Sequence, residues 1–396
     1  GAMTEPKARA RARVEAARPR LIEISHRLHA NPELAYEEYA SAALLADALE
    51  DGGLRVARAV HGLDTAFRAT AGSAGPHIVV CAEFDALPGI GHACGHNIIA
   101  ASSVGAGLAL ALLADELGFR LSVLGTPAEE SGGGKVDLIR AGAFDDADVA
   151  LMVHPAPIEV VDWPTLAWAT VKVAYHGKEA HASMAPWRGV NALDAVNLAY
   201  MAVSALRQHV LPTERVHGIV THGGDAPNVV PNLTRATWFV RAANRPDLEA
   251  LKPRVVRCLE AGALATGCEM ELTFPANDYD PVCTNPTLAS LYEENLRALG
   301  REAVPRAAVV AQAGSTDMGN VSEVVPSIHP LMSINSFPVV NHQEAFAAHT
   351  VTPDGDRAVT DAAVAIAWTA VDAVRPGALA RIREDFRTRP PAVPTL

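Results

Sequence analysis

The sequence predicts an α/β protein in which a mixed, mostly parallel sheet is flanked by helices and the chain is interrupted by an inserted α+β domain. Three observations predict this fold class. Short apolar, β-branched runs alternate with helical patterns, as in parallel sheets that are covered on both faces. From about residue 168 the strands alternate in polarity instead, and the first pattern resumes near residue 285. The 396 residues also exceed what one hydrophobic core normally supports. We therefore expect one domain from residues 4–167 and 284–396, and a second from residues 168–283.

The first expected domain opens with two helices. One covers about residues 7–29 with a single apolar face, and Pro32 ends it. The second covers about residues 37–51 and ends at Gly52. Further strands are expected at 54–58, 65–70, 78–82, 121–124 and 149–153, with helices at 98–114 and 135–141.

The insertion and the C-terminal part follow from the same patterns. In the insertion we expect strands at 168–176, 218–222, 234–242 and 269–274, and helices at about 190–208 and 247–266. A helix at about 285–299, loops rich in Gly, Ser and His up to about 352, and a closing helix at about 354–374 then complete the first domain.

Charge and composition exclude several classes of protein. The formal charge of −12 argues against binding to nucleic acid or to an anionic membrane surface. The apolar run after His96 is shorter than the roughly 18 residues of a membrane span and contains serine and glycine, so a buried helix is expected there. Five scattered cysteines form no disulfide framework, and residues 7–20 lack the apolar region of a signal peptide. We therefore expect a cytoplasmic protein.

A cluster of reactive side chains follows the predicted strand at 78–82. This loop contains Asp85, His92, Cys94 and His96, and it leads into the apolar helix. In open α/β sheets the loops at the carboxyl ends of the strands line the ligand crevice. One thiol and two imidazoles within five positions suit a metal such as zinc, although a buried cysteine with incidental histidines would give the same pattern.

Two further strands end in polar groups. Glu129 and Glu130 follow the strand at 121–124, and His154 follows the strand at 149–153. Taken singly, a glutamate pair is usually solvated and a lone histidine is usually structural. Parallel strands lie about 4.8 Å apart, however, so groups at their carboxyl ends can meet in one crevice. Burying several ionisable groups together favours a bound cation, and one glutamate can then hold the metal while the other takes a proton from water.

The glycine run that ends at Gly134, followed by Lys135, might suggest a phosphate-binding loop. Glu129 occupies the place of the first glycine of such a loop, and Val136 replaces the Ser or Thr that follows the lysine. Nucleotide binding is therefore not expected.

Seven motifs, in this order along the chain, resemble those of the amidohydrolase branch of the aminoacylase/carboxypeptidase-G metallopeptidases, peptidase family M20: Arg27–Glu33, Glu83–Pro88, His92–His96, Pro127–Glu130, Met152–His154, Gly177–His181 and Asn228–Pro231. The resemblance covers about residues 25–375 and implies a metal-dependent exopeptidase-like catalytic domain with an inserted lid or dimerisation domain. At the position after His96, where many members of the family have an aspartate, this sequence has Asn97. Together with the stretch Gly314–Ser322, it resembles the branch of p-aminobenzoyl-glutamate hydrolase and β-alanyl-lysine-type dipeptidases.

The resemblance also implies a binuclear metal centre. Its ligands would be a C-terminal histidine together with Cys94, His96, Glu130 and His154. His342 is the preferred C-terminal ligand, because His342 and Phe346 match the family's His-x-x-x-aromatic pattern, and His349 is the alternative. The thiolate favours zinc, and manganese, cobalt or nickel are the other candidates.

The remaining roles in the first domain are those of residues beside the metal ligands. Asp85 resembles the carboxylate that orients a ligand, and Glu129 matches the general base. No family pattern makes His92 a ligand, so we expect it to be a loop histidine near the site.

In the inserted domain three residues resemble substrate-handling groups. His181 resembles the histidine that a partner subunit contributes to polarise the scissile carbonyl, which implies a homodimer formed through this domain. Asn228 and Arg241 resemble groups that hold the carbonyl and the substrate carboxylate, a task that suits the planar guanidinium. From the residues alone, His181 could equally cap the following segment and Arg241 could be a surface residue of a strand.

These features together predict a metal-dependent hydrolase of amide bonds. The expected substrates are N-acyl or N-aroyl amino acids or dipeptide-like molecules of the aminobenzoyl-glutamate type, cleaved by water with Glu129 as general base and Asp85 and His181 in support. Two alternatives stay open: an amidase with Cys94 as nucleophile, and a non-catalytic amide-binding protein on the same fold.

Overall fold

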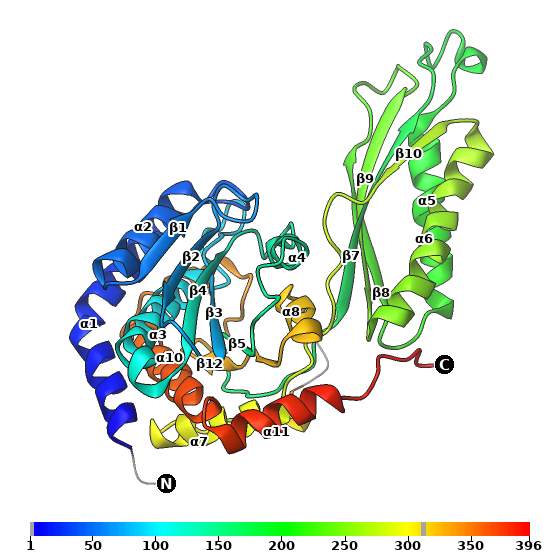
Figure 1. Cartoon of the computed structure of the whole chain (residues 1–396). Coiled ribbons are helices and arrows are strands. Elements are labelled where there is room, and N and C mark those ends of the chain that lie inside the picture. The colour runs from blue at the N-terminus through cyan, green and yellow to red at the C-terminus, as the bar shows by residue number, and fades with distance from the viewer. Residues whose placement is uncertain (1–3, 310–313) are drawn as a thin grey trace. The chain divides into compact units, whose positions relative to one another are not determined.

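The chain divides into two compact units in a computed structural model that describes residues 4–309 and 314–396. The first unit runs to Pro164 and resumes over Val282–Pro390, and the inserted unit comprises Thr165–Pro281 with the last six residues, Pro391–Leu396. Each unit has its own sheet and its own hydrophobic core. Figure 1 shows both units.

The first unit is built on a mixed sheet of six strands. Their order is β1 (Arg55–Arg58), β2 (Phe67–Ala71), β4 (Arg120–Thr126), β3 (His77–Glu83), β5 (Val149–Leu151) and β11 (Ser327–Ile328). The pairs β1–β2 and β2–β4 are antiparallel, and the pairs β4–β3, β3–β5 and β5–β11 are parallel. The predicted mixed, mostly parallel sheet is therefore confirmed.

The central strand β3 is apolar over residues 78–82, between His77 and Glu83 at its two ends. Every residue of this strand is buried. Ile78 and Val80 belong to one hydrophobic cluster, whereas Val79 and Cys81 belong to another that contains residues of β4, α4 and α8. Because successive side chains point to opposite faces, a strand covered on both faces is apolar at successive positions in its middle.

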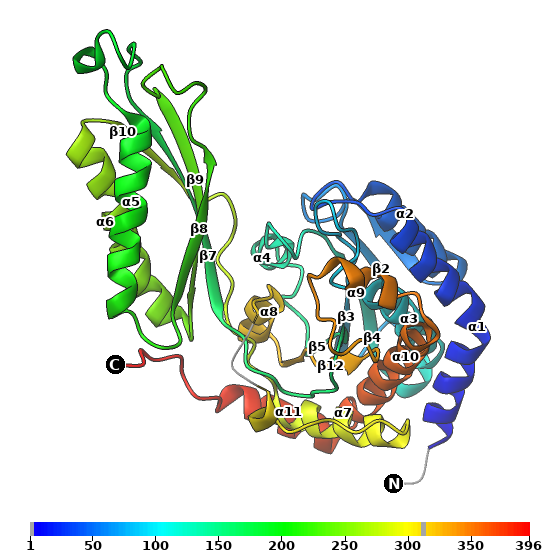
Figure 2. The same cartoon turned by 180° about the vertical axis from the view of Figure 1, so that it is seen from behind.

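Helices cover both faces of this sheet (Figures 1 and 2). One face carries α1 (Glu5–Ala30), α2 (Tyr39–Asp51), α3 (His96–Leu117) and α10 (Pro353–Ala373), and α7 (Pro286–Ala298) and α11 (Pro376–Arg387) pack beside α10. The other face carries α4 (Gly134–Arg140) and α8 (Met318–Val324). Among the described residues, α3 is the one helix that by itself is long and apolar enough for a membrane span, but 89% of its apolar stretch is buried inside the unit. It is a core helix.

The region after residue 300 contains more structure than the loops that the sequence predicts. Besides α8 it holds β11, β12 (Leu331–Ser333) and α9 (Glu344–His349). β12 pairs in parallel with β6 (His154–Ala156), so it lies directly beside a predicted site residue.

The inserted unit has a four-stranded antiparallel sheet with two helices. The strand order is β10 (Glu269–Thr273), β7 (Ala167–His176), β9 (Leu233–Ala242) and β8 (Arg215–His222). Both helices, α5 (Ala192–Leu206) and α6 (Arg245–Thr266), lie on one face of the sheet (Figure 1). Along β9, buried positions alternate with partly exposed ones, which is the pattern of a sheet with one covered face.

The C-terminal tail packs with the inserted unit, whereas the domain boundaries drawn from sequence assign it to the other one. The backbone N–H of Thr395 donates to Asp247 at the start of α6, at 3.0 Å. The sequence could not predict this contact, because the last six residues have no periodic pattern and Thr395 is far from Asp247 along the chain.

Candidate active site

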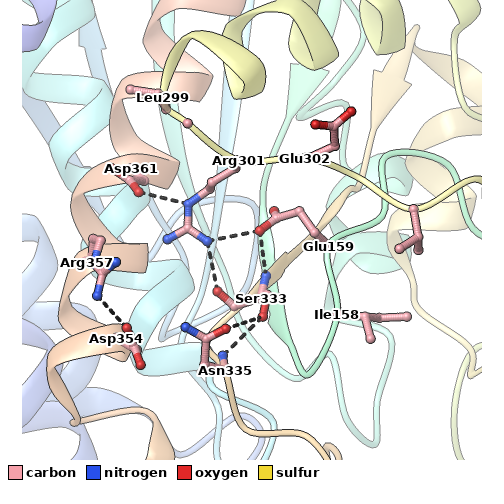
Figure 3. Close-up of a pocket in the computed structure, with 12 residues that line it drawn as sticks. Ile158, Glu159, Leu299, Arg301, Glu302, Ser333, Asn335, Asp354, Arg357 and Asp361 are labelled. Carbon is pink, nitrogen blue, oxygen red and sulfur yellow. Dashed lines mark hydrogen bonds and ion pairs between the residues drawn. The ribbon is translucent and has the colours of Figure 1, made fainter.

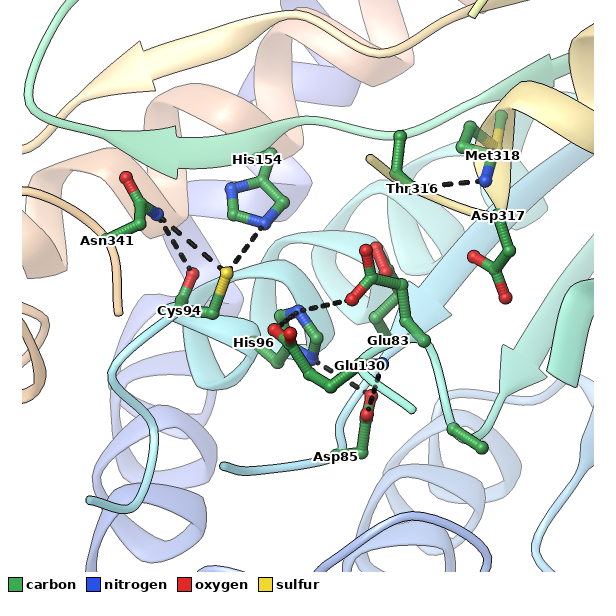
Figure 4. A network of polar contacts seen from close by, with 12 residues as sticks. Glu83, Asp85, Cys94, His96, Glu130, His154, Thr316, Asp317, Met318 and Asn341 are labelled. Atoms are coloured by element: carbon green, nitrogen blue, oxygen red, sulfur yellow. Dashed lines mark hydrogen bonds and ion pairs between the residues drawn. The ribbon is translucent and has the colours of Figure 1, made fainter. Parts of the chain in front are cut away.

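The polar side chains at the strand ends of the first unit lie together. Asp85 follows β3, Glu129 and Glu130 follow β4, and His154 begins β6 after β5. Cys94 and His96 lie at the start of α3, on either side of Gly95. Figure 4 shows Cys94, His96, Glu130 and His154 directed toward one another.

Gly95 is required at this point for two reasons. Its φ angle is 79°, in the left-handed region that glycine tolerates. A Cβ atom added there would lie 2.4 Å from the ring of Pro155, the residue after His154. The backbone can therefore bring the thiol and the imidazoles close only if this residue has no side chain.

The ligand-type atoms form overlapping groups. In two of them all atoms lie within 4.8 Å of one another: Cys94 with His96 and His154, and Cys94 with Glu130 and His342. Cys94 Sγ lies 3.4 Å from His154 Nε2, and Glu130 lies 3.3 Å from His96 Nε2 through one oxygen and 3.3 Å from His342 Nε2 through the other. The five residues expected to hold metal thus converge, and Cys94 is common to both groups.

Hydrogen bonds on the far side of each ring aim the histidines at this centre. His154 Nδ1 donates to the carbonyl of Pro155 at 2.7 Å, and His96 Nδ1 lies 3.0 Å from Asp85 Oδ1. In both residues Nε2 is the nitrogen that faces the centre. This is the arrangement by which proteins orient imidazole ligands.

Of the two C-terminal histidines, the geometry favours His342. Its backbone has a φ angle of 71° and its N–H donates to the carbonyl of Ala93 at 2.9 Å, so its loop lies against the Cys94 segment. His349 belongs to no group of clustered ligand atoms among the described residues.

Charge explains why this centre suits cations. Burial lowers the pKa of His154 to about 4, which keeps that ring neutral. Burial also opposes the charged form of His96, but Asp85 outweighs it and raises the pKa of His96 to about 10. Burial and the nearby Glu130 raise the pKa of the Cys94 thiol well above its usual value. Without a metal, protons therefore compensate the buried negative groups, and metal binding would displace them.

Two buried polar atoms also indicate that this centre can hold a metal ion. His96 Nε2 and Glu130 Oε1 are buried, face each other at 3.3 Å and have no hydrogen-bond partner among the described residues. A thiol, imidazoles and a carboxylate are the donor set that zinc and related divalent metals take. The residues present therefore fit a metal centre.

Glu129 lies beside these groups. Its carboxylate is 3.7 Å from His96 Nε2, and the residue is only 5% exposed. Burial, followed by repulsion from Glu130 and Glu83, raises the pKa of Glu129 well above the ordinary value for a glutamate. A carboxylate with a raised pKa takes up a proton more readily than an ordinary glutamate does, as a general base must.

A group of buried charged side chains that the sequence did not predict lies next to these residues. Lys135 Nζ lies 3.0 Å from Asp317 and 3.2 Å from Glu83, and all three side chains are fully buried. His329 is also buried, with its ring centroid 5.4 Å from that of His154. Glu83 and Asp317 belong to stretches quoted for the resemblance and His329 does not, and only the fold shows that these residues are buried together. His92 is buried as well and belongs to none of the clustered groups.

A separate cavity of the first unit has a different character. It measures about 420 Å³, and Arg301 in its wall contacts Glu159 at 3.0 Å and Asp361 at 2.8 Å (Figure 3). None of the predicted site residues lines it. The Arg301 guanidinium is paired by carboxylates of the chain itself, so we assign Arg301 a structural role.

The three predicted residues of the inserted unit fall into two places within that unit. His181 forms a bridge with Val229, and the N–H of Ala182 donates to the carbonyl of Asn228 at 2.9 Å, so His181 and Asn228 lie on neighbouring segments. Arg241 lies near the other end of β9, where its guanidinium is 5.1 Å from the centroid of the Trp168 ring.

The ring of His181 has a defined orientation. Its Nδ1 accepts hydrogen bonds from the backbone N–H groups of Ser183 and Met184, at 3.2 and 3.0 Å. An Nδ1 that accepts leaves the proton on Nε2, and the residue is exposed. His181 therefore presents a hydrogen-bond donor outward.

Several known proteins have sequences similar to this chain. The model of peptidase family M20/M25/M40 matches residues 79–365. The mouse Xaa-Arg dipeptidase is 41% identical over 399 residues, which cover 97% of this chain and 92% of that protein. A p-aminobenzoyl-glutamate hydrolase subunit from Escherichia coli is 34% identical over 282 residues, covering 66% of this chain and 59% of that protein.

Solved structures show the same fold. An aminobenzoyl-glutamate utilization protein from Klebsiella pneumoniae matches with a TM-score of 0.69 at 20% identity, covering 88% of this chain and 96% of that one. A dinuclear metal-binding peptidase from Bacillus subtilis matches with a TM-score of 0.63 at 22% identity, covering 89% and 98%. The chain therefore belongs to peptidase family M20/M25/M40, and it is a hydrolase that acts on amide bonds.

Proposed function

We propose that this hydrolase is a dipeptidase that prefers a basic residue at the C-terminus of its substrate. The observation that carries the proposal is the 41% identity to the Xaa-Arg dipeptidase along nearly the whole of both chains. The p-aminobenzoyl-glutamate hydrolase subunit matches over a shorter part and at lower identity. A dipeptide also has the free carboxylate that Arg241 is suited to hold.

The metal centre of this proposal is formed by Cys94, His96, Glu130, His154 and His342. We propose zinc as the native metal, because of the thiol and imidazoles, with manganese, cobalt and nickel as the alternatives. Bound cations would supply Lewis acidity, which polarises the scissile carbonyl and makes a water molecule acidic enough to lose a proton near neutral pH.

The chain's own groups then move the protons. Glu129 takes a proton from the attacking water and delivers it to the amine that leaves. Asp85 keeps His96 in one orientation through the contact at 3.0 Å, and it accepts the N–H of Glu130 at 2.9 Å through its other oxygen. The outward-facing Nε2–H of His181 and the amide of Asn228 donate to the oxygen that becomes negative.

The positions of these groups in the inserted unit support a homodimer. Asn228 and His181 lie beyond the Leu233 end of β9, whereas Arg241 is eight residues further along that strand. At about 3.3 Å per residue, this separates Leu233 from Arg241 by roughly 26 Å, too far for both ends to reach one dipeptide. We therefore propose that His181 and Asn228 serve the active site of a partner subunit, and that Arg241 of the same chain does not serve that site.

Exposed apolar side chains on the inserted unit support the same assembly. Met201 on α5 and Leu264 on α6 are 66% and 88% exposed, and Ile219 on the edge strand β8 is 65% exposed. Symmetric interfaces between protein subunits commonly form from exposed apolar side chains and from the edge strands of sheets. The five cysteines are all unpaired, which supports the proposed cytoplasmic location.

The decisive experiment is a substrate screen on protein loaded with Zn²⁺ or Mn²⁺. It should compare dipeptides ending in Arg or Lys with uncharged dipeptides, N-acetyl and N-benzoyl amino acids and p-aminobenzoyl-glutamate. The proposal expects the highest kcat/KM for the basic dipeptides. A higher value for p-aminobenzoyl-glutamate or for N-acyl amino acids would refute the substrate assignment.

A second experiment tests Glu129 and the thiol alternative. Glu129→Gln should keep its metal content and lose about 10² to 10⁴-fold in kcat, whereas the exposed Glu37→Gln should behave as wild type. EDTA should abolish activity and added metal should restore it. An amidase that uses Cys94 as nucleophile would survive EDTA and be inactivated by iodoacetamide instead.

A further inference from the structure

The segment that carries both glutamates, residues 127–134, is an unusually tight turn, and we call it the glutamate loop. The N–H groups of Gly132, Gly133 and Gly134 all point to the carbonyl of Ala128, at 3.2, 2.9 and 3.3 Å. Ala128 itself has a φ angle of 59°, a conformation that residues with a side chain rarely adopt. A backbone of this kind keeps its shape only when its surroundings hold it there.

Three buried carboxylates hold the loop and the residue that follows it. Glu38 accepts the backbone N–H of Ala128 at 2.9 Å, and Asp85 accepts that of Glu130 at 2.9 Å. Asp317 accepts the N–H of Lys135, at the start of α4, at 3.0 Å. The three carboxylates come from segments far apart in sequence, and each holds a different point of the backbone.

Each carboxylate is itself held through its second oxygen. Thr65 Oγ1 donates to Glu38 at 3.1 Å, and Lys135 Nζ donates to Asp317 at 3.0 Å. Glu38 and Asp317 are fully buried and Asp85 is 1% exposed. Hydrogen bonds buried to this depth are shielded from bulk solvent, so the carboxylates act as fixed points.

We propose that Glu38 and Asp317 are positioning residues for amide hydrolysis, which hold the glutamate loop so that Glu129 and Glu130 reach the metal centre. This inference rests on the proposed role of that centre. The two residues do not contact the ligand atoms, and they act through the backbone of the loop. A displacement of about 1 Å in a reacting group can lower turnover by about 100-fold, so such restraint matters for rate even where the fold survives.

The test compares two glutamates of one segment. Glu38→Ala removes the acceptor for Ala128. Glu33→Ala is the matched control, because Glu33 binds Ser41 and Ala40 at the start of α2 and its side chain makes no hydrogen bond to the glutamate loop. Glu38→Gln keeps an acceptor oxygen and serves as the conservative variant.

Three quantities are measured on the metal-loaded, full-length protein: kcat and KM for an arginine-terminated dipeptide, bound metal, and hydrogen exchange of a peptide that spans the loop. Glu38→Ala should lower kcat by at least about tenfold with KM changed less than about threefold, and should speed exchange in the loop. Glu38→Gln should recover most of both effects, and Glu33→Ala should show neither. Asp317→Asn should show the same pattern as Glu38→Ala in a weaker form.

If hydrogen exchange in the glutamate loop of Glu38→Ala were as slow as in wild type, the inference would be overturned, and an unchanged kcat would overturn it too. An equal loss in Glu33→Ala would also overturn it, because the effect would then follow from the stability of α2. The exchange comparison does not depend on any substrate. If wild-type protein cleaved no dipeptide, the proposed function would fail, and the exchange data alone would still decide on the role of Glu38.

Discussion

Replacing Glu38 with glutamine should stabilise the metal-free protein at alkaline pH much more than at acidic pH. Burial, reinforced by repulsion from the Asp85 carboxylate, raises the pKa of Glu38 from 4.5 to about 7. Because each tenfold change in an acid dissociation constant is worth about 1.4 kcal/mol, ionised Glu38 costs the folded state roughly 3 kcal/mol. Glutamine has the shape of the protonated acid and carries no such cost.

The sign of the pH dependence follows from the two states. Well below the ordinary pKa of 4.5 both the folded and the unfolded chain hold the proton, and the effect vanishes. Between 4.5 and about 7 the folded chain keeps a proton that the unfolded chain has lost, so stability falls as the pH rises. The gain from Glu38→Gln should therefore be about 2.5 kcal/mol larger at about pH 8 than at about pH 5.

Urea unfolding of EDTA-treated protein measures this difference, since bound dications would themselves lower the pKa of nearby carboxyl groups. The exposed neighbour Glu37, changed to Gln, is the control and should give the same small effect at both pH values. An equal stabilisation by Glu38→Gln at both pH values would refute the reasoning. It would mean that Glu38 is not buried as a costly charge.

Three further predictions concern other parts of the site. Lys135→Met should lower the free energy of unfolding, measured by urea titration, by about 3–5 kcal/mol, because it leaves two buried carboxylates without their cation. The control Lys172→Met, at an exposed position, should change that free energy by less than about 0.5 kcal/mol. Mixing two inactive variants, His181→Gln and Arg241→Ala, under conditions that exchange subunits should restore about a quarter of wild-type activity. About half of the dimers are then mixed, and each mixed dimer has one intact site of two. No recovery of activity would contradict the shared active site. Gly95→Ala should weaken metal binding in a competition with a chromogenic chelator, since the new Cβ would lie 2.4 Å from Pro155, and unchanged affinity would contradict the role given to this turn.

Local periodicity explains which elements the sequence could predict. The apolar strand at 78–82 and the helix at 98–114 are found as β3 and α3 with bounds shifted by a few residues, because their patterns extend over enough positions to be recognised. β11 has two residues and β12 has three. Strands this short have no period of their own, and they form because β5 and β6 lie beside them in the fold. Only tertiary structure reveals them.

The same distinction applies to the site. Cys94, Glu130 and His154 could be placed together from sequence because they follow parallel strands, whose carboxyl ends share one edge of the sheet. His342 comes from a loop, so only the resemblance to the family indicated it. Glu38 gave no signal: it stands beside Glu37 in a pair that would normally be solvated, yet Glu37 is exposed and Glu38 is fully buried. Which of two adjacent carboxylates turns inward is decided by Thr65 and Ala128, which are distant in sequence.

The charges buried around the centre couple metal binding to folding. Glu83, Asp85, Glu129 and Asp317 are each at most 5% exposed, and the buried Lys135 lies within ion-pair distance of Glu83 and Asp317. In the metal-free chain their mutual repulsion lowers stability, and protons relieve part of it. Divalent cations relieve more, because they place positive charge where the carboxylates and the thiol converge. Replacing Glu129, whose pKa is raised by burial and by the neighbouring carboxylates, should therefore make the metal-free protein more stable while it makes metal-loaded protein less active. That inverse relation is expected when a site holds like charges together for a ligand that is added after folding.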